Sequence, residues 1–388
     1  MTSDRVVIVG GAIIGSFAAW FLRKQGFAGT VTVVEQDPTY AFSATARSAA
    51  SIRTQFGTPT NVALSLFGVD FFRKIKTHFG AGADIGYHEG GYLILGGPDA
   101  VAERLAGLAM QQNAGADVVA LTPAQMQARF PYLNVDGIGI GTFGQSGEGW
   151  FDAWSLLSLV RKSARDLGVD YVEAKASGLV AQGERVTGVT LASGVTLPCD
   201  WCVNACGPAS GKLAATIGID LPVSARKRTV FNFRAPVDPK GFPMLFDTSG
   251  IWVRPEGAGF IGGIQPPADQ DPDATGDFEP HHHLLEDPFW PLLAARIPAM
   301  EELRLDRAWA GHYEVNALDH NGIVGPHHDL TNLIFATGFS GHGVMHAPAV
   351  GRAVAEWITR SCYASIDIGP LGWNRIRDKQ PMVETVVY

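Results

Sequence analysis

VVIVGGAIIGSFAAWFL, residues 6–22, is the stretch of the sequence that decides the fold. Its first four residues are apolar and mostly β-branched, and they end at a pair of glycines, whereas residues 16–22 suit a helix. A second β-branched run, TVTVVEQDP, follows at residues 30–38 and contains an acidic residue at its end. A strand, a glycine turn, a helix and a strand within about thirty residues predict a βαβ unit rather than a signal peptide or a membrane span.

The glycine turn of this unit matches the dinucleotide-binding fingerprint. In such units the first glycine makes a tight turn, the pyrophosphate lies at the helix N-terminus, and the last glycine lets helix and strand pack closely. Glu35, 20 residues beyond Gly15, stands where an acid binds a ribose hydroxyl. Ala12 replaces the middle glycine, and we expect its methyl group to be tolerated. The residues predicted to bind the nucleotide here are Gly10, Gly11, Ala12, Ile13, Ile14, Gly15, Glu35 and Gln36.

Composition indicates a large globular protein. The chain has 388 residues, of which 46% are hydrophobic and 18% charged, enough for two domains or one elaborate one. A formal net charge of −8, with no basic run beyond RKR at 226–228, argues against a nucleic-acid surface. We expect no insertion into a membrane.

The cysteines and histidines do not predict a metal site. Four cysteines in a chain of this size are not a secreted disulfide framework, so the expected location is the cytoplasm. Cys199, Cys202 and Cys206 fall on a predicted buried strand, which cannot gather three thiolates around one ion. The HHH at 281–283 opens a predicted surface helix over about 284–296.

Two further segments bring glycines toward the nucleotide turn. Residues 178–208 read as a three-strand meander followed by a strand that ends near Gly207. TNLIFATGFSGHGVMHAPAVGRAVAEWI, residues 331–358, reads as a strand, a glycine loop and a helix over 345–361. The nucleotide domain is therefore predicted to be discontinuous in the sequence.

Several motifs, taken in order, carry a family resemblance. The N-terminal unit, the loop 43–48, VNACGP at 203–208 and GFSGHGVMHAPAVGRAVAE at 338–356 together resemble the FAD-dependent D-amino acid oxidase/sarcosine oxidase superfamily over nearly the whole chain. TARSAASIRTQFGTP and PMLFDTSGIWVRPEGAGFIGG resemble members that oxidise amino acids or N-substituted glycines. These include sarcosine-type oxidases, proline dehydrogenase β-subunits and D-arginine dehydrogenases.

The resemblance implies an α/β protein with two discontinuous domains. A Rossmann-like FAD-binding domain of the glutathione-reductase-like type is expected from residues 1–88, 151–222 and 322–388. A β-rich, α+β substrate-binding domain is expected from residues 89–150 and 223–321. Stretches such as RTVFNFRAP and GIWVRPEGAGFIGGI agree with a sheet that roofs the flavin.

The resemblance also implies how FAD is held. The further residues expected to bind it are Thr45, Ala46, Arg47, Ser48, Ala205, Gly207, Gly338, Gly341, His342, Gly343, Val344 and Met345. Members with covalent FAD have a cysteine where this chain has Gly311, so non-covalent FAD is expected. Lysines that assist the reduced flavin in sarcosine-type oxidases would fall at Ile261 and Met345. Their absence weakens the expectation of an oxidase and leaves oxygen or another electron acceptor open.

The substrate site is expected around Arg53. An arginine fork suits a carboxylate, and Arg53 follows the flavin loop where related oxidases place their substrate arginine. Tyr313 matches a family tyrosine that contacts substrate, and His342 is expected to support the flavin or shape the pocket rather than act as an acid or base. The candidates for a second carboxylate are Arg226, Arg228 and Arg254, for which pairing with solvent or with the protein is the alternative.

The leading hypothesis is an FAD-dependent oxidoreductase that oxidises the C–N bond of an amino acid or secondary amine acid. Hydride transfer to flavin N5 would give an imine, which water hydrolyses. D-amino acids, sarcosine-like or iminodiacetate-like compounds and imino acids all remain open as substrates. The alternatives are a flavin-binding assembly or electron-transfer subunit of a larger complex, and oxidation of a 2-hydroxy acid. The sequence leaves the oligomeric state undetermined.

Overall fold

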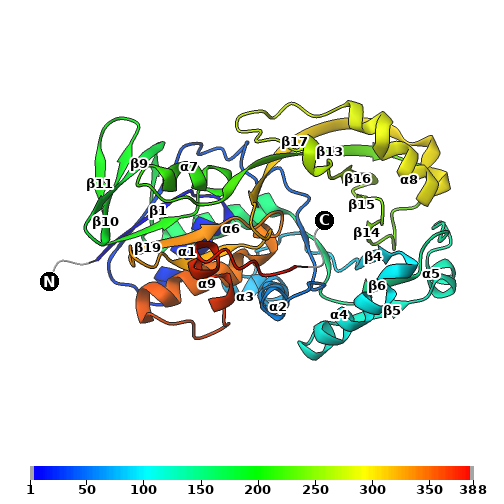
Figure 1. The fold of residues 1–388 in the computed structure, drawn as a ribbon, viewed down its shortest axis with the longest axis horizontal. Helices are drawn as coiled ribbons and strands as arrows, with labels where there is room; N and C mark the ends of the chain where they lie inside the picture. The colour runs from blue at the N-terminus through cyan, green and yellow to red at the C-terminus, as the bar shows by residue number, and fades with distance from the viewer. Residues whose placement is uncertain (1–3, 385–388) are drawn as a thin grey trace.

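The computed structural model describes residues 4–384. A six-stranded sheet forms one half of the molecule, which contains the predicted nucleotide turn (Figure 1). Four strands in the middle, β19, β12, β1 and β2, run parallel, and β8 continues the parallel set beyond β2. The strand order is β18 (Ile323–Pro326), β19 (Leu333–Thr337), β12 (Trp201–Asn204), β1 (Arg5–Val9), β2 (Thr30–Glu35) and β8 (Asp170–Glu173). Parallel strands covered by helices are buried on both faces, which explains their runs of valine and isoleucine.

Helices with small residues at their contacts cover this sheet. Helix α1 (Ile13–Lys24) packs on α9 (Gly343–Arg360), and a Cβ at Gly351 would lie 2.5 Å from Phe17. The next helices are α2 (Pro59–Arg73), α3 (Ile75–Phe79) and α6 (Ala153–Asp166). Gly68 lets α2 approach the backbone of Met345 in the same way, at 2.5 Å. Close helix contacts thus fix the first turn of α9 relative to the sheet.

An eight-stranded sheet forms the other half of the molecule. Figure 1 shows its two long strands, β13 and β17, reaching from the six-stranded sheet to the far side of the molecule. The strand order is β17 (Arg304–Asn316), β13 (Val223–Arg234), β16 (Gly259–Ile264), β15 (Ile251–Glu256), β14 (Met244–Phe246), β4 (Tyr92–Gly96), β6 (Ile140–Gly144) and β5 (Val118–Leu121). Alternate residues such as Phe231 and Val253 pack into a core with α5 (Pro123–Arg129) and α8 (Trp290–Arg296). The intervening residues, such as Val230 and Trp252, face the opposite side, which is the side of the candidate site.

Smaller elements complete the described chain. The predicted meander is a three-stranded sheet of β9 (Ala176–Gln182), β10 (Arg185–Leu191) and β11 (Thr196–Pro198). The remaining elements are the two-stranded sheet of β3 (Ser51–Ile52) and β7 (Gly149–Trp150), and the helices α4 (Val101–Asn113), α7 (Ser210–Ala215) and α10 (Trp373–Arg377). Within residues 4–384, no helix combines the length and the apolar character that a membrane crossing needs.

Two predicted helices differ in detail from the structure. The helix predicted over about 284–296 is interrupted, because Asp287 has φ −148° and ψ 112° and regular α-helix starts only at Trp290. Pro288 explains this break, since a residue before proline avoids the α conformation. The helix predicted over 345–361 begins at Gly343 and ends at Arg360, because Ser361 adopts the left-handed conformation with φ +56°.

Candidate functional site

The first glycine turn lies at the carboxyl end of β1, where contacts leave no room for a side chain. Gly10 has φ +99°, and a Cβ there would lie 2.2 Å from the carbonyl oxygen of Ala205. A Cβ at Gly15 would lie 1.9 Å from the carbonyl oxygen of Gly10, so α1 begins in direct contact with the preceding turn. Both positions therefore require glycine.

The N-terminus of α1 and the end of β2 meet at this turn. No side chain caps α1 at Ala12, and the backbone N–H of Ile13 lies 3.4 Å from the Thr45 hydroxyl oxygen. The Glu35 carboxylate accepts a hydrogen bond from the N–H of Gly11 at 2.8 Å. A helix N-terminus without a side-chain cap, a close-packed glycine turn and an acid at the end of the second strand fit the pyrophosphate and ribose of FAD.

The other residues predicted to bind FAD lie along the same edge of the sheet. Because β1, β2, β12 and β19 are parallel, their carboxyl ends meet at one edge. Ala205 and Gly207 follow β12, and the loop 338–342 follows β19. The loop 43–48 reaches this edge through Thr45, while Gln36 is exposed beside it. The structure thus brings these segments together, and their contacts with FAD stay a prediction.

The loop from Gly338 to His342 requires unusual backbone conformations. Gly338, Ser340 and Gly341 have φ values of +77°, +48° and +100°. Gly341 lies against Tyr313, because a Cβ there would come within 2.6 Å of the aromatic ring. Helix α9 starts immediately afterwards, with no side-chain cap at His342. The glycines flanking His342 are therefore explained by close packing and by left-handed turns.

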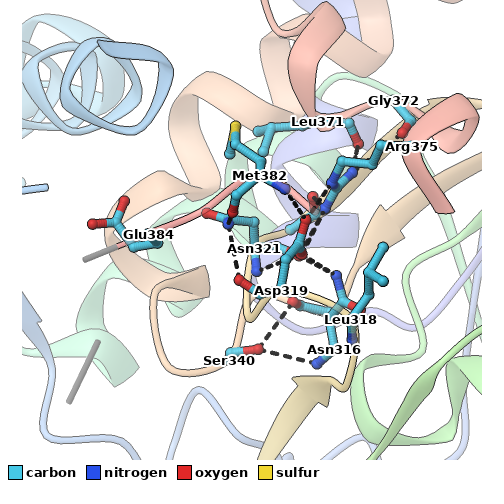
Figure 2. A network of polar contacts seen from close by, with 12 residues as sticks. Asn316, Leu318, Asp319, Asn321, Ser340, Leu371, Gly372, Arg375, Met382 and Glu384 are labelled. Carbon is cyan, nitrogen blue, oxygen red and sulfur yellow. Dashed lines mark hydrogen bonds and ion pairs between the residues drawn. The ribbon is translucent and has the colours of Figure 1, made fainter. Parts of the chain in front are cut away.

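A buried polar network supports the loop from Gly338 to His342 (Figure 2). The N–H of Asn316 donates to the Ser340 hydroxyl at 3.0 Å, and the Asn316 amide donates to Asp319 at 2.8 Å. Asp319 forms an ion pair with Arg375 of α10. The Asp319 side chain is 1% exposed and the Arg375 side chain is 8% exposed. It also accepts from the N–H of Met382 at 3.0 Å. The last described segment of the chain thereby helps to fix the loop.

A cavity lies where this loop, the eight-stranded sheet and residues 44–53 meet. Its empty volume is about 990 Å³, counted out to its opening to solvent. Arg47, Arg53 and Arg228 line it, and its described lining contains no aspartate or glutamate. The aromatic lining residues include Tyr92, Phe246, Trp252 and Tyr313. A cavity with cationic groups and apolar walls suits an anionic ligand that carries apolar groups.

Arg53 is the best-supported of these cations. Its residue is 3% exposed, and its guanidinium lies 4.4 Å from the centre of the Phe56 ring. Its Nη2 lies 3.1 Å from Nε2 of His342. Burial and the neighbouring Arg53 charge hold the pKa of His342 well below its usual range, so the imidazole is neutral and Nε2 accepts from Arg53. His342 thus contacts the arginine directly, and its predicted supporting role stays a prediction.

The sequence analysis missed Glu148, which fixes the segment after Arg53. Glu148 is completely buried, and its carboxylate accepts from the backbone N–H of Thr54 at 2.6 Å and from its hydroxyl at 2.7 Å. It also accepts from the side chain of Gln55 at 2.8 Å. Gly144 makes room for it, because a Cβ there would lie 1.9 Å from Oε2 of Glu148. The only sequence signal of this close packing was the glycines beside Glu148 in GQSGEGW, and they did not identify the residues that Glu148 contacts.

Tyr313 and Arg228 line the cavity side by side. The Arg228 guanidinium lies 5.2 Å from the centre of the Tyr313 ring. Burial raises the pKa of Tyr313, so its hydroxyl stays protonated. Arg228 forms two hydrogen bonds of 2.8 Å with Asp271, and both side chains are nearly buried. Its charge is therefore already matched by a carboxylate of the protein.

Arg254 and Arg226 have structural contacts and are not among the described residues that line the cavity. The Nε of Arg254 donates to the carbonyl oxygen of Ala49 at 2.9 Å, and Nη1 bonds to Glu256 at 2.6 Å. Arg226 donates to the Ser224 hydroxyl at 2.8 Å. Arg254 was predicted to bind a second carboxylate. Its donors are instead engaged by the protein itself, where they connect the sheet to the loop after Ser48.

The two positions at which the resemblance implied a lysine are apolar and buried. Met345 lines the cavity and is 4% exposed, while Ile261 is 2% exposed on β16. Gly311 also lines the cavity, and a Cβ there would lie 2.9 Å from the Cβ of Arg47. A side chain at position 311 would therefore displace Arg47.

Clusters of cysteine and histidine have local partners. The Cys206 thiol donates to the carbonyl oxygen of Val9 at 3.3 Å. Ligand atoms of His327, His328 and Asp329 lie within 4.8 Å of one another. However, Nδ1 of each histidine accepts a hydrogen bond, from the N–H of Asp329 and from the Trp373 indole. The Nδ1 lone pair of each ring is therefore already engaged within the protein.

Replacing His342 with alanine is expected to weaken carboxylate binding by roughly tenfold, because a hydrogen bond to a charged group contributes about 1.5 kcal/mol or more. His342→Gln, which can still accept from Arg53, should restore most of it. The measurement is the dissociation constant of a non-reactive carboxylate such as benzoate, read from the shift of the flavin spectrum. Equal binding by the wild type and the alanine variant would contradict the predicted supporting role.

His346 is expected to make stability depend on pH. It is buried against Ser65, and burial lowers its pKa to about 3. Below about pH 6.5 the unfolded chain binds a proton there that the folded chain does not, so stability falls as pH falls, by about 2 kcal/mol at pH 5. Urea unfolding at pH 7 and pH 5 measures this loss. His346→Gln, which keeps a hydrogen-bond partner for Ser65, should show a smaller loss, whereas an unchanged difference would contradict the assignment.

The fold and the site are those of a flavoprotein class. A βαβ unit carries the dinucleotide fingerprint, and a second sheet closes a cavity beside the edge where the predicted cofactor residues meet. The chain belongs to the FAD dependent oxidoreductase family (DAO), whose model matches residues 5–357. It is an FAD-dependent oxidoreductase, with the Rossmann-like FAD fold and second sheet that the resemblance implied.

Similar proteins cover nearly the whole chain. It is 37% identical to FAD-dependent oxidoreductase domain-containing protein 1 of Xenopus laevis, over 98% of this chain and 84% of that protein. It is 26% identical to glycine oxidase of Bacillus licheniformis, over 91% and 92% of the two chains. The crystal structure of L-proline dehydrogenase from P. horikoshii matches with a TM-score of 0.86 and 25% identity, covering 98% of this chain and 99% of that one.

Proposed function

We propose that this protein oxidises the C–N bond of an α-amino or secondary-amine carboxylate to an imine, which water then hydrolyses. The observation that carries the proposal is the buried Arg53, held by His342 and Phe56 in a cavity beside the FAD-binding edge. A guanidinium fixed in this way is a bidentate partner for a carboxylate.

FAD, when bound, supplies a hydride acceptor for this oxidation. Arg53 binds and orients the substrate carboxylate, and the Tyr313 hydroxyl can donate a further hydrogen bond. Nearby arginines lower the pKa of a bound ammonium group, which favours the free amine required for hydride loss. The aromatic walls exclude water from the reacting carbon.

The relatives support the same class of substrate. Glycine oxidase and L-proline dehydrogenase are named for α-amino and imino acids, both of which carry a carboxylate beside the C–N bond. Because Asp271 already neutralises Arg228, we infer that one carboxylate is clamped rather than two. This favours monocarboxylates over iminodiacetate-like dicarboxylates.

We also propose that the two sheets define the domains. Residues 1–88, 151–222 and 322–388 would form the FAD-binding domain, and residues 89–150 and 223–321 the substrate-binding domain. Supporting this division, every strand of the six-stranded sheet falls in the first set and every strand of the eight-stranded sheet in the second.

Anaerobic titration of the flavoprotein tests the activity. Glycine, sarcosine, proline and D-alanine should be compared with iminodiacetate, with lactate and with amines that lack a carboxylate, while the flavin absorbance is followed. Bleaching by one or more amino monocarboxylates is expected. If none of the amines bleaches the flavin, or if the hydroxy acid is faster, the proposed reaction is wrong.

Two additions to the same experiment address the electrons and the flavin linkage. After air is readmitted, slow recovery of absorbance would support an acceptor other than oxygen, as the apolar Met345 and Ile261 suggest. Acid precipitation should release the flavin into solution, and flavin retained in the pellet would contradict non-covalent binding.

A further inference from the structure

Glu314 is a buried acidic residue that the proposed reaction does not use. It follows Tyr313 on β17, and the two side chains point to opposite sides of the strand because neighbouring residues alternate. The Glu314 carboxylate accepts from the Thr337 hydroxyl at 2.9 Å and from the N–H of Gly338 at 3.2 Å. Its own carbonyl oxygen accepts from the N–H of Ser340 at 3.1 Å. Glu314 is therefore part of the support beneath the glycine loop.

The carboxylate lies beside the first turn of α9. A Cβ at Gly343 would be 3.3 Å from Oε1 of Glu314, and a Cβ at Gly207 would be 3.6 Å from Oε2. Gly343 is the first residue of α9, and its neighbours His342 and Val344 line the cavity. The backbone of Gly343 thus lies between the Glu314 carboxylate and the cavity, which is next to the proposed flavin-binding segments.

The surroundings of Glu314 leave its charge uncompensated. Within residues 4–384 it forms no ion pair with a lysine, arginine or histidine. The ionisable group that interacts with it is the Cys206 thiol, whose pKa is also raised by burial and by the Glu314 charge. Burial raises the pKa of Glu314 to about 7, although hydrogen bonds from Thr337 and Gly338 oppose the rise. The carboxyl group therefore titrates much closer to neutral pH than an exposed glutamate does.

We propose that Glu314 takes up one proton from solvent when the bound flavin is reduced, and thereby couples the flavin reduction potential to pH. Hydride transfer from the substrate would bring two electrons and one proton to the flavin, so a flavin held by the predicted residues 341–345 would gain one negative charge at the start of α9. That charge favours the neutral form of a nearby carboxyl group, so a second proton converts the Glu314 carboxylate to the carboxylic acid. The inference rests on the cofactor placement proposed above.

Potentiometric titration with dithionite and redox dyes tests the coupling. The sign of the expected difference in flavin reduction potential follows from charge. At high pH the negative charge of Glu314 lowers the potential, whereas at low pH Glu314 is neutral and resembles glutamine. The potential of Glu314→Gln should therefore exceed that of the wild type by an amount that grows between about pH 6 and pH 9. One extra proton per two electrons corresponds to about 30 mV per pH unit in the coupled range. A constant offset or no offset would indicate a purely structural role and overturn the proposal.

Two controls keep the test decisive. Glu356→Gln removes a different buried carboxylate, which belongs to α9 and lies near the far end of that helix, where it pairs with Arg352. It should leave the wild-type pH dependence unchanged, and a similar change there would overturn the assignment to Glu314. If Glu314→Gln fails to hold FAD, the redox-difference infrared spectrum of the wild type decides. A protonated carboxyl band should appear on reduction and shift in D₂O, and its absence would refute proton uptake.

Because dithionite needs no amine substrate, this result is independent of the proposed activity. Failure of the amine panel with a positive potentiometric result would leave the role of Glu314 intact. The reverse outcome would leave the amine oxidation intact and remove only the coupling.

Discussion

Replacing Arg53 with methionine is expected to lower kcat/KM for amino carboxylate substrates by roughly 10²- to 10³-fold, while the protein still binds FAD. The reason is that a buried, hydrogen-bonded charge pair contributes about 2–5 kcal/mol once one partner is removed. Arg53 lies in the cavity rather than in the glycine turn around Gly10, so loss of flavin is not expected. Anaerobic stopped-flow reduction of the flavin measures the effect directly.

Matched variants separate loss of the clamp from loss of structure. Arg53→Lys keeps the charge but not the planar fork, so it should recover only part of the rate. Arg73→Met removes an arginine whose partner Glu89 is on the surface, and it should be close to wild type. Undiminished flavin reduction in Arg53→Met, with normal FAD content, would show that another group binds the carboxylate.

The parts of the fold predicted well are those written in local patterns. The βαβ unit around Gly10 follows from a change of period within about thirty residues, and helix α9 follows from a glycine loop after an apolar run. The pairing of β4 beside β14 was not predictable, since these strands are distant in sequence and join in parallel. Their partnership depends on long-range packing, which no local pattern contains.

The same distinction applies to the site. Arg53, Tyr313 and His342 were predicted from motifs, and the structure brings all three to one cavity. The direct contact between Arg53 and His342 joins residues 289 positions apart, and no spacing rule gives it. Glu148 and Asp271 were missed because an acid in a glycine-rich or proline-rich loop ordinarily indicates a solvated turn. Their burial is visible only once the opposite segment is in place.

The sequence also did not show which arginines belong to the site. Three arginines, at 226, 228 and 254, are equivalent in the sequence as possible carboxylate partners. The structure distinguishes them by their position and by their acidic partners. Arg228 lines the cavity and pairs with Asp271, whereas Arg254 does not line it and pairs with Glu256. The role of a charged residue on a strand thus depends on the residues that pack against its side chain.

Replacing Gly10 with alanine is expected to abolish FAD binding and to lower the thermal stability of the isolated protein. Gly10 has φ +99°, and the new Cβ would lie 2.2 Å from the carbonyl oxygen of Ala205. That oxygen cannot easily move, because the N–H of Ala205 bonds to Val9 at 2.9 Å. The turn must therefore open, which displaces the N-terminus of α1 where the pyrophosphate is proposed to bind.

Gly26→Ala is the matched control for the backbone effect. Gly26 also has a positive φ, +80°, but nothing lies within 4 Å of its added Cβ. Both variants pay a left-handed conformational cost of about 1–2 kcal/mol, and only Gly10→Ala adds the clash at the nucleotide turn. The flavin-to-protein ratio and the rise in Tm on adding FAD measure the difference. The wild type and Gly26→Ala should both gain stability with FAD, since a ligand that binds the folded state stabilises it, whereas Gly10→Ala should not. An equal rise in all three proteins would mean that FAD does not depend on this turn.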